Sequence, residues 1–292
     1  MASGVTTTGP KYEPYLDKSP APFRWTLGLR PLDLADWIEI DTHYARDVAL
    51  KARYSTEFPD TVLRHLPGIE AEAYELLDTL VTHLRGLDPA RFGTLTTDAA
   101  TDRGRLHPLD AAGRLVQEDL VLLVEREGRL VCGGGSVCFP NRWDLAAKVG
   151  RTMAEIHAPV AQLNTQLADP IDRALARLTP ERSFWRLGYG LLDTGDLYQA
   201  VDGTAPRASG PVPVEGYFLR VERETLRRLP GTGCIVFTIR THLTPIGAIR
   251  GRSARVLADA LAAMPDDVLG YKQLAEVAPA MVAYLRERAL TT

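Results

Sequence analysis

Two apolar runs joined by a short turn limit the folds open to this chain more than any other feature. Residues 118–125 and 130–139 are rich in Val, Leu, Cys and Gly, and Glu127-Gly128 supplies the turn between them. Apolar runs separated by a short glycine-containing turn are typical of a β-hairpin. The middle of the chain therefore predicts an antiparallel sheet.

Further strands follow the hairpin, and helical patterns lie on both sides of this region. Strands are expected at 184–192, 217–222 and 234–243, where β-branched and aromatic residues are frequent. Because the strands follow one another without alternating βαβ units, the pattern favours the α+β class over a Rossmann sheet. Helices are expected at 32–53, 69–84, 142–156, 224–229, 253–264 and 271–287.

The chain has 292 residues, and domains usually hold about 100–200. Residues 1–23 contain Pro10, Pro14, Pro20 and Pro22, which forbid a regular helix there, so we expect an extended N-terminal arm. Residues 24–292 are expected to form a single domain.

Charge and hydropathy exclude several classes of partner. The net charge is −3, from 34 basic and 37 acidic residues, so no nucleic-acid partner is indicated. The longest apolar runs are too short to cross a bilayer, so no membrane association is expected. Three cysteines cannot build a disulfide framework, which favours a reducing, cytoplasmic location.

Common catalytic motifs are missing from the sequence. It has no Walker-type phosphate loop and no G-x-S-x-G elbow. The glycines of Gly133–Ser136 lie within a strand, where a bulge or a close backbone approach is a better explanation than nucleotide binding. Successive histidines are at least eighteen residues apart, so no local zinc motif exists.

His157 is the histidine with the most unusual setting. It follows an amphipathic segment, has apolar neighbours on both sides, and precedes Pro159, which ends the helix. A neutral imidazole held in this way suits an axial haem ligand. On the residues alone, a histidine that simply packs at a helix end is the alternative. The thiol of Cys138 is a competing haem ligand, although a buried, inert thiol is the simpler interpretation.

Charged residues interrupt the predicted strands. Strand alternation places Arg220 and Glu222 on one face, where an arginine could pair with an acidic ligand and a carboxylate could receive an ammonium group or a proton. Arg186 and Arg240 are likewise single charges within apolar strands. A solvated charged edge is the alternative.

At these residues the chain resembles the haem-dependent oxidative N-demethylases, which include the haem subunit of dimethylamine monooxygenase. The resemblance runs from about Trp25 to Arg288, in family order. The matching blocks are Gln117–Leu120, Cys138–Trp143 leading to Lys148–Gly150, Ile156–Val160, Arg220–Leu226, Arg228–Pro230 and Phe237–Thr241.

This resemblance implies a PAS-like antiparallel sheet flanked by N- and C-terminal helices. It also implies a b-type haem (haem b) with its iron, O2 as a substrate, and electrons from a separate flavin/iron–sulfur reductase or ferredoxin. His157 becomes the expected iron ligand. The other expected site residues are Glu222 and Arg223 for catalysis and Arg186, Arg220 and Arg240 for binding the cofactor.

The sequence therefore predicts a haem-dependent monooxygenase that oxidises a small amine or an amino-acid-like substrate. Oxidative N-demethylation, or a related C–H or N oxidation, is the expected reaction. Where the family motif reads Arg-x-Asn-Trp, this chain has Arg186-Leu187-Gly188-Tyr189, a departure that points to a larger amine, an amino acid or a pathway intermediate in place of dimethylamine. A haem-based gas or redox sensor and a haem-free binding scaffold are the alternatives.

Overall fold

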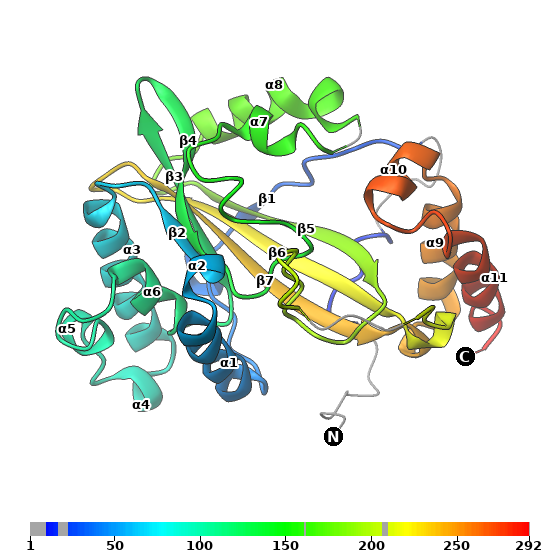
Figure 1. Cartoon of the computed structure of the whole chain (residues 1–292), viewed down its shortest axis with the longest axis horizontal. Coiled ribbons are helices and arrows are strands. Elements are labelled where there is room, and N and C mark those ends of the chain that lie inside the picture. The colour runs from blue at the N-terminus through cyan, green and yellow to red at the C-terminus, as the bar shows by residue number, and fades with distance from the viewer. Residues whose placement is uncertain (1–9, 17–22, 161, 206–209, 292) are drawn as a thin grey trace.

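The computed structural model describes residues 10–16, 23–160, 162–205 and 210–291. A seven-stranded antiparallel sheet lies at its centre, in the order β1-β5-β6-β7-β3-β4-β2 (Figure 1). The predicted α+β class is confirmed. The strands are β1 (Arg30–Leu32), β2 (Leu63–His65), β3 (Asp119–Arg126), β4 (Arg129–Ser136), β5 (Ser183–Leu192), β6 (Phe218–Arg228) and β7 (Ile235–Pro245).

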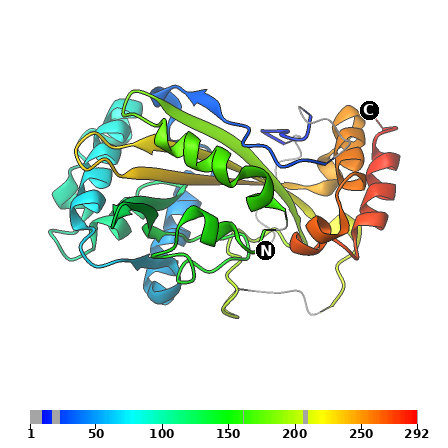
Figure 2. The same ribbon diagram turned by 90° about the horizontal axis from the view of Figure 1, so that it is seen from above.

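Helices cover both faces and both ends of this sheet (Figures 1 and 2). None of the described helices has the length and apolar character needed to span a membrane. The helices are α1 (Tyr44–Glu57), α2 (Pro59–Val62), α3 (Glu70–Leu87), α4 (Pro89–Phe92), α5 (Thr97–Ala100), α6 (Pro108–Gly113), α7 (Met153–His157), α8 (Leu163–Ala176), α9 (Gly251–Ala262), α10 (Asp266–Tyr271) and α11 (Ala278–Arg288).

The predicted hairpin is β3 and β4, and its glycines allow close approach between strands. A register shift between Leu122 and Leu123 marks a bulge opposite the glycine run. A Cβ on Gly134 would lie 2.5 Å from the Cβ of His65 on β2. The glycines therefore let β2 pair closely with β4, as the sequence indicated.

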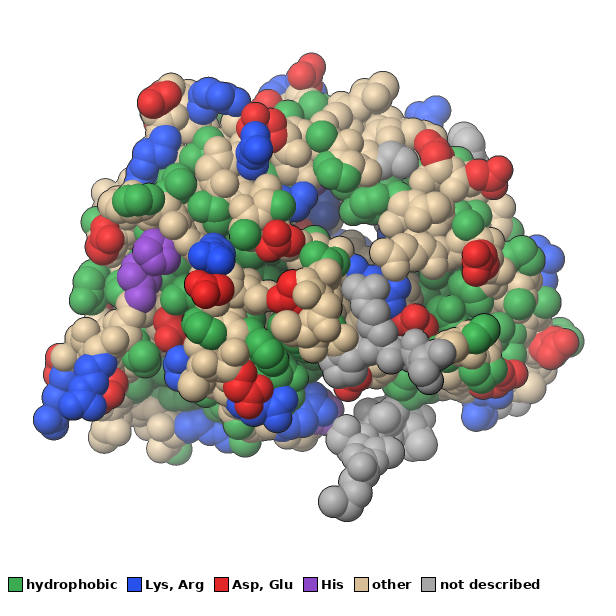
Figure 3. Space-filling model, viewed as in Figure 1, with side chains coloured by type: hydrophobic (Ala, Val, Ile, Leu, Met, Phe, Trp, Pro, Cys, Tyr) green, Lys and Arg blue, Asp and Glu red, His purple; other side chains and the backbone are tan. Residues whose placement is uncertain are grey.

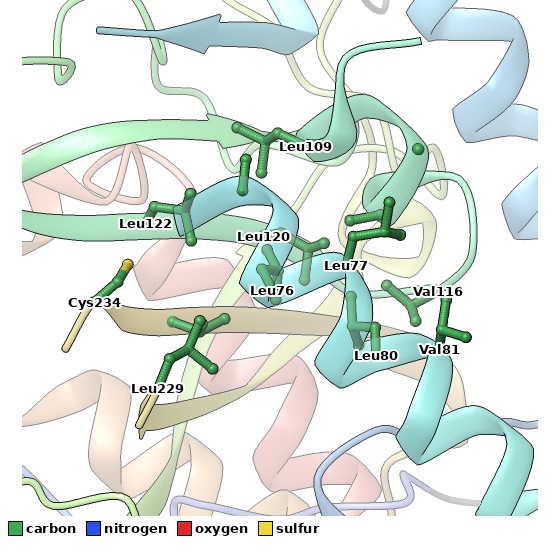
Figure 4. Packing of buried hydrophobic residues seen from close by; sticks show 14 of the residues in the cluster. Leu76, Leu77, Leu80, Val81, Leu109, Val116, Leu120, Leu122, Leu229 and Cys234 are labelled. Atoms are coloured by element: carbon green, nitrogen blue, oxygen red, sulfur yellow. The ribbon is translucent and has the colours of Figure 1, made fainter. Parts of the chain in front are cut away.

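Two apolar layers pack on one face of the sheet. At the β3–β4 end, alternate residues such as Leu120 and Leu122 pack against α3 and α6, as Figure 4 shows around Leu76, Leu77 and Leu80. At the other end, β5 and β6 pack against α9 and α11. Both layers bury every second strand residue, which leaves the intervening residues to the opposite face.

That opposite face is covered by α7, α8 and the segment before them. Val121, Leu123 and Ile235 of the sheet pack there against residues such as Met153 and Ile171. We call this the cavity face, because a cavity lined by residues of the sheet, α7 and α8 lies on it.

The helix predicted over 142–156 is wrong for most of its length, since only Met153–His157 is α-helical. Arg142 and Gly150 both have positive φ angles. The Gly150 amide donates to Cys132 O, and the Cys132 amide donates to Arg151 O. Pairing with β4 therefore overrides the helical pattern of the segment.

The helix predicted over 224–229 is also wrong, because these residues continue β6. Thr225 and Leu226 pair with Thr238 and Phe237 on β7, and the two threonine hydroxyls lie 2.7 Å apart. β6 has partners on both sides, and this pairing outweighs the local preference of a Glu-Thr-Leu-Arg-Arg run.

The other boundaries differ less. The helix predicted over 32–53 begins only at Tyr44, after a 3₁₀ turn at Leu34–Asp36. The last predicted helix, 271–287, is α11, which begins at Ala278. Of the predicted arm, 1–9 and 17–22 lie outside the described residues. Within its described part, Tyr15 is fully buried and its hydroxyl lies 2.6 Å from Ser253 Oγ.

Candidate functional site

A cavity of about 690 Å³ lies between the sheet and the segments that cover its cavity face. Its volume falls within the range of roughly 300–1,000 Å³ that is usual for small-molecule and cofactor pockets. Residues of β3, β5, β6 and β7 form one wall, and residues of α7, α8 and the segment 141–148 form another. The face in Figure 3 is hollowed beside this region, with Lys or Arg side chains at the hollow.

His157 reaches the cavity from the end of α7. The helix begins with a capping box, in which Thr152 accepts from the Glu155 amide and Glu155 accepts from the Thr152 amide. It ends at His157, as Pro159 predicts. A short, firmly capped helix thus fixes the position of the histidine backbone.

The imidazole of His157 has no hydrogen-bond partner for its buried Nδ1 atom. Burial lowers the pKa of His157 to about 4, and the nearby charges of Arg186 and Lys148 add to this effect. Lys148 also donates to the carbonyl of Ile156, at 2.9 Å, next to the histidine. A neutral, unpartnered imidazole therefore lines the cavity at physiological pH.

Two glycines leave the sheet bare where it faces the cavity. Gly188 and Gly190 of β5 both line it. A Cβ on Gly190 would meet no atom within 4 Å, and one on Gly188 would lie 3.2 Å from Glu224 Oε1. A flat ligand could therefore lie against the sheet at Gly190 without displacing a side chain.

Two ion pairs stand beside the bare strand. Arg186 Nε donates to Glu224 Oε2 at 2.5 Å, across the β5–β6 pairing. Arg220 Nε donates to Glu222 Oε1 at 2.9 Å. The neighbouring Glu224 carboxylate raises the pKa of Arg186, so this guanidinium stays charged.

The structure separates the predicted site residues into two groups. His157, Arg186 and Glu222 line the cavity. Arg220 lies on the same face as Glu222, but its guanidinium donates to Phe139 O and Thr241 Oγ1 and does not line the cavity. It holds Glu222 in place instead.

Arg223 and Arg240 lie on the opposite face. Each is the neighbour in its strand of a residue that lines the cavity, and successive side chains of a strand point to opposite faces. Arg223 donates to the carbonyls of Asp36 and Trp37. Arg240 donates to Asp41 at 2.6 Å. The structure thus brings neither residue to the cavity.

Sequence reasoning missed several cavity residues. Lys148, Cys132, Trp143 and Lys272 all line the cavity. The Gly188-Tyr-Gly190 spacing was a usable signal, because alternate glycines in a strand leave one face without side chains. Trp143 and Lys148 lie in blocks that resemble the family, but no local pattern marked them, Cys132 or Lys272 as cavity residues. Burial raises the pKa of the Cys132 thiol to about 11 and that of Cys138 to about 12, which keeps both thiols protonated.

Glu39 organises a charged network on the face that carries Arg223. It accepts from Tyr12 and Lys11, and its Oε2 lies 2.8 Å from His242 Nε2. Burial alone would raise the pKa of Glu39, but its bonds to His242, Lys11 and Tyr12 hold it well below the ordinary value.

This network predicts a pH dependence of stability. A carboxyl whose folded pKa is depressed stabilises the fold above its unfolded pKa, near 4.5, and this stabilisation is lost as the pH falls further. We expect Glu39→Gln to remove a stabilisation on the order of 2 kcal/mol at neutral pH, and to flatten the loss of stability below pH 4.5. Urea unfolding of both proteins across this range measures the effect. A free energy of unfolding that differs between the two proteins by the same amount at every pH would contradict this role of Glu39.

No three His, Cys, Asp or Glu residues within the described ranges are grouped as ligands for a metal ion. A comparison with protein families matches residues 28–282 to the family described as "Haem-dependent oxidative N-demethylase, alpha subunit-like".

Proposed function

Because the chain belongs to the family of haem-dependent oxidative N-demethylases, alpha subunit-like, we propose that it is a haem-dependent monooxygenase acting on a small amine or an amino-acid-like substrate. For an N-methyl amine, O2, two electrons and two protons would yield the demethylated amine, formaldehyde and water. A separate flavin/iron–sulfur reductase or ferredoxin would supply the electrons. The observation that carries this proposal is the unpartnered imidazole of His157 in the cavity.

The residues of the cavity fit a haem in three respects. His157 is neutral and its Nδ1 atom is unpartnered, which is the state in which an imidazole would bind the iron of a haem. Gly188 and Gly190 leave a bare surface for a flat macrocycle. Apolar side chains such as Leu123 and Phe237 line much of the rest. A haem bound there would supply the activation of O2.

Haem b carries two propionate groups, and the cavity provides positive charge for them. Lys148, Arg186 and Lys272 all line it. Arg186 is held by Glu224 and keeps its charge. We assign these side chains, in place of Arg240, to the acidic edge of the cofactor.

Glu222 is the cavity carboxylate that we assign to the substrate. It is half-buried, and Arg220 holds its Oε1 atom at 2.9 Å. A carboxylate fixed in this way can accept a hydrogen bond from a protonated amine, or hold a proton near the reacting nitrogen. Its pairing position opposite Gly188 leaves it beside the bare surface.

The proposal is tested by haem titration followed by turnover. The full chain is titrated with haem at the Soret band, and then supplied with O2, a flavin/iron–sulfur reductase and either dimethylamine or N-methylglycine. We expect near-stoichiometric loading and release of formaldehyde with the demethylated amine. Loading without product would favour the sensor, and failure to load would favour the haem-free scaffold.

A matched pair of glycine variants links both results to the cavity. In Gly190→Leu the side chain extends into open space, so the chain should fold but bind haem about tenfold to a hundredfold more weakly, since overpacking of this size costs about 1–3 kcal/mol. In Gly86→Leu, on α3, the new side chain also enters open space, outside the cavity. Equal haem affinity in the two variants would contradict the assignment of the cavity.

A further inference from the structure

A second hollow, of about 390 Å³, lies on the face of the sheet opposite the cavity. It is formed where α3 meets the end of β6. Its lining residues are Leu34, Asp78, Thr79, Thr82, His83 and Arg227. None of these residues lines the cavity that holds His157, so the two sites are separate.

Two side chains that line this hollow, His83 and Arg227, leave buried polar atoms unpaired, and Trp37 packs against both of them without lining the hollow. The guanidinium of Arg227 lies 4.4 Å from the centre of the Trp37 ring, and the rings of Trp37 and His83 are 5.4 Å apart. Trp37 Nε1, His83 Nε2 and Arg227 Nε are all buried without a hydrogen-bond partner. Trp37 is fully buried, and its indole N–H can only donate.

Such a group of unpaired atoms is unusual, because buried polar atoms are nearly always hydrogen-bonded. An indole N–H and a guanidinium can only donate, and a neutral imidazole can donate from one nitrogen. A partner that satisfies the Arg227 and His83 nitrogens at the hollow must therefore accept hydrogen bonds.

The charge at the hollow favours an anion. Arg227 forms no ion pair with any residue that the structure describes; its contact is the Trp37 ring. Burial lowers the pKa of Arg227, and burial together with Arg227 lowers the pKa of His83. The acidic residue at the hollow, Asp78, is exposed, and its carboxylate accepts from the Thr97 hydroxyl.

We propose that this hollow binds a small carboxylate, held by Arg227 and His83 beside the buried Trp37 ring. A carboxylate matches the planar fork of a guanidinium and accepts several hydrogen bonds at once. The single positive charge of Arg227 matches the single negative charge of a carboxylate. A phosphate dianion would exceed that charge and also face Asp78. The inference does not depend on haem or on the proposed reaction.

The indole N–H signal of Trp37 provides a readout of binding, because the Trp37 ring contacts both Arg227 and His83. Proton–nitrogen spectra of the full chain are recorded while acetate replaces chloride at constant ionic strength and pH, and Trp37→Phe assigns the signal. We expect the Trp37 signal to shift and saturate. In Arg227→Gln the apparent affinity should fall about tenfold or more, because a hydrogen bond to a charged group is lost.

Matched variants separate binding from changes in charge or folding. Arg85→Gln removes one exposed positive charge from α3 and should leave the titration unchanged. Arg227→Lys keeps the charge without the fork and should bind more weakly than the parent but more tightly than Arg227→Gln. Thermal unfolding confirms that each variant is folded.

Several results would overturn the inference. They are a Trp37 signal that does not saturate with acetate, and an Arg227→Gln variant that binds as tightly as the parent. Inorganic phosphate that binds more tightly than acetate would overturn the assignment to carboxylates.

Discussion

The His157→Ala variant should bind haem about 100-fold or more weakly than the parent chain. Removing a group that merely supports a metal ligand costs about 10–100-fold in affinity, so removing the ligand itself should cost at least the upper value. The imidazole of His157 lines the cavity and has no partner for Nδ1. Its loss should therefore affect the cofactor far more than the fold. Titration of haem at the Soret band measures the change.

His43→Ala is the matched control, because His43 lies at the start of α1 and does not line the cavity. Its haem affinity and Soret spectrum should equal those of the parent. Added imidazole should restore part of the haem binding of His157→Ala, since the truncated side chain leaves space for it. A His157→Ala variant with the affinity and spectrum of the parent would disprove the assignment of the ligand.

Asp119→Ala should cause the largest loss of stability. Asp119 is 1% exposed, and its carboxylate accepts from the amides of Cys138 and Phe139 at 2.8 and 2.9 Å. It also lies 3.6 Å from the amino group of Lys51, which is 0% exposed. Truncation would leave a buried ammonium without its counter-charge and two amides without their acceptor. We expect a loss of about 3–5 kcal/mol in the free energy of unfolding.

The contrasting variant is Glu57→Ala. Glu57 pairs with Arg53 on α1, and both side chains are about half exposed. Its removal should cost about 0.5 kcal/mol or less. Urea unfolding of both variants measures the difference, provided that the free energy of unfolding depends on urea concentration with the same slope in each. Similar losses from the two substitutions would show that the Asp119–Lys51 pair contributes no more than an exposed pair.

The elements that could be predicted from the sequence are those with strong local signals. The β3–β4 hairpin, β5, β7 and α3 are marked by apolar periodicity and turn residues that act within a few positions. The position of His157 at a helix end follows from Pro159 in the same way. The capping box of Thr152 and Glu155 was a further local signal, and it would have corrected the start of α7.

The parts that were missed depend on contacts between distant segments. The later part of β6 is a strand because Glu224–Leu226 pair with both β5 and β7, and Arg227 and Arg228 pair with β7. The segment before α7 is irregular because it pairs with β4 and with Gln199. The candidate site shows the same limit. Alternation separates Glu222 from Arg223, but it does not say which face holds the cavity.

The two faces of β6 impose different tolerances on neighbouring positions. Glu222 and Glu224 belong to the cavity side, while Arg223 between them anchors the chain around Asp36 and Trp37. Substitutions at Glu222 and Glu224 should therefore change the lining of the cavity while the scaffold is kept. Insertion or deletion of a single residue in β6 would reverse which side chains face the cavity. Arg223 would then point into the cavity, and Glu222 and Glu224 would point into the core on the other face. Related chains that differ in the lining of this cavity should therefore differ by substitutions in β6 and should keep the length of the strand.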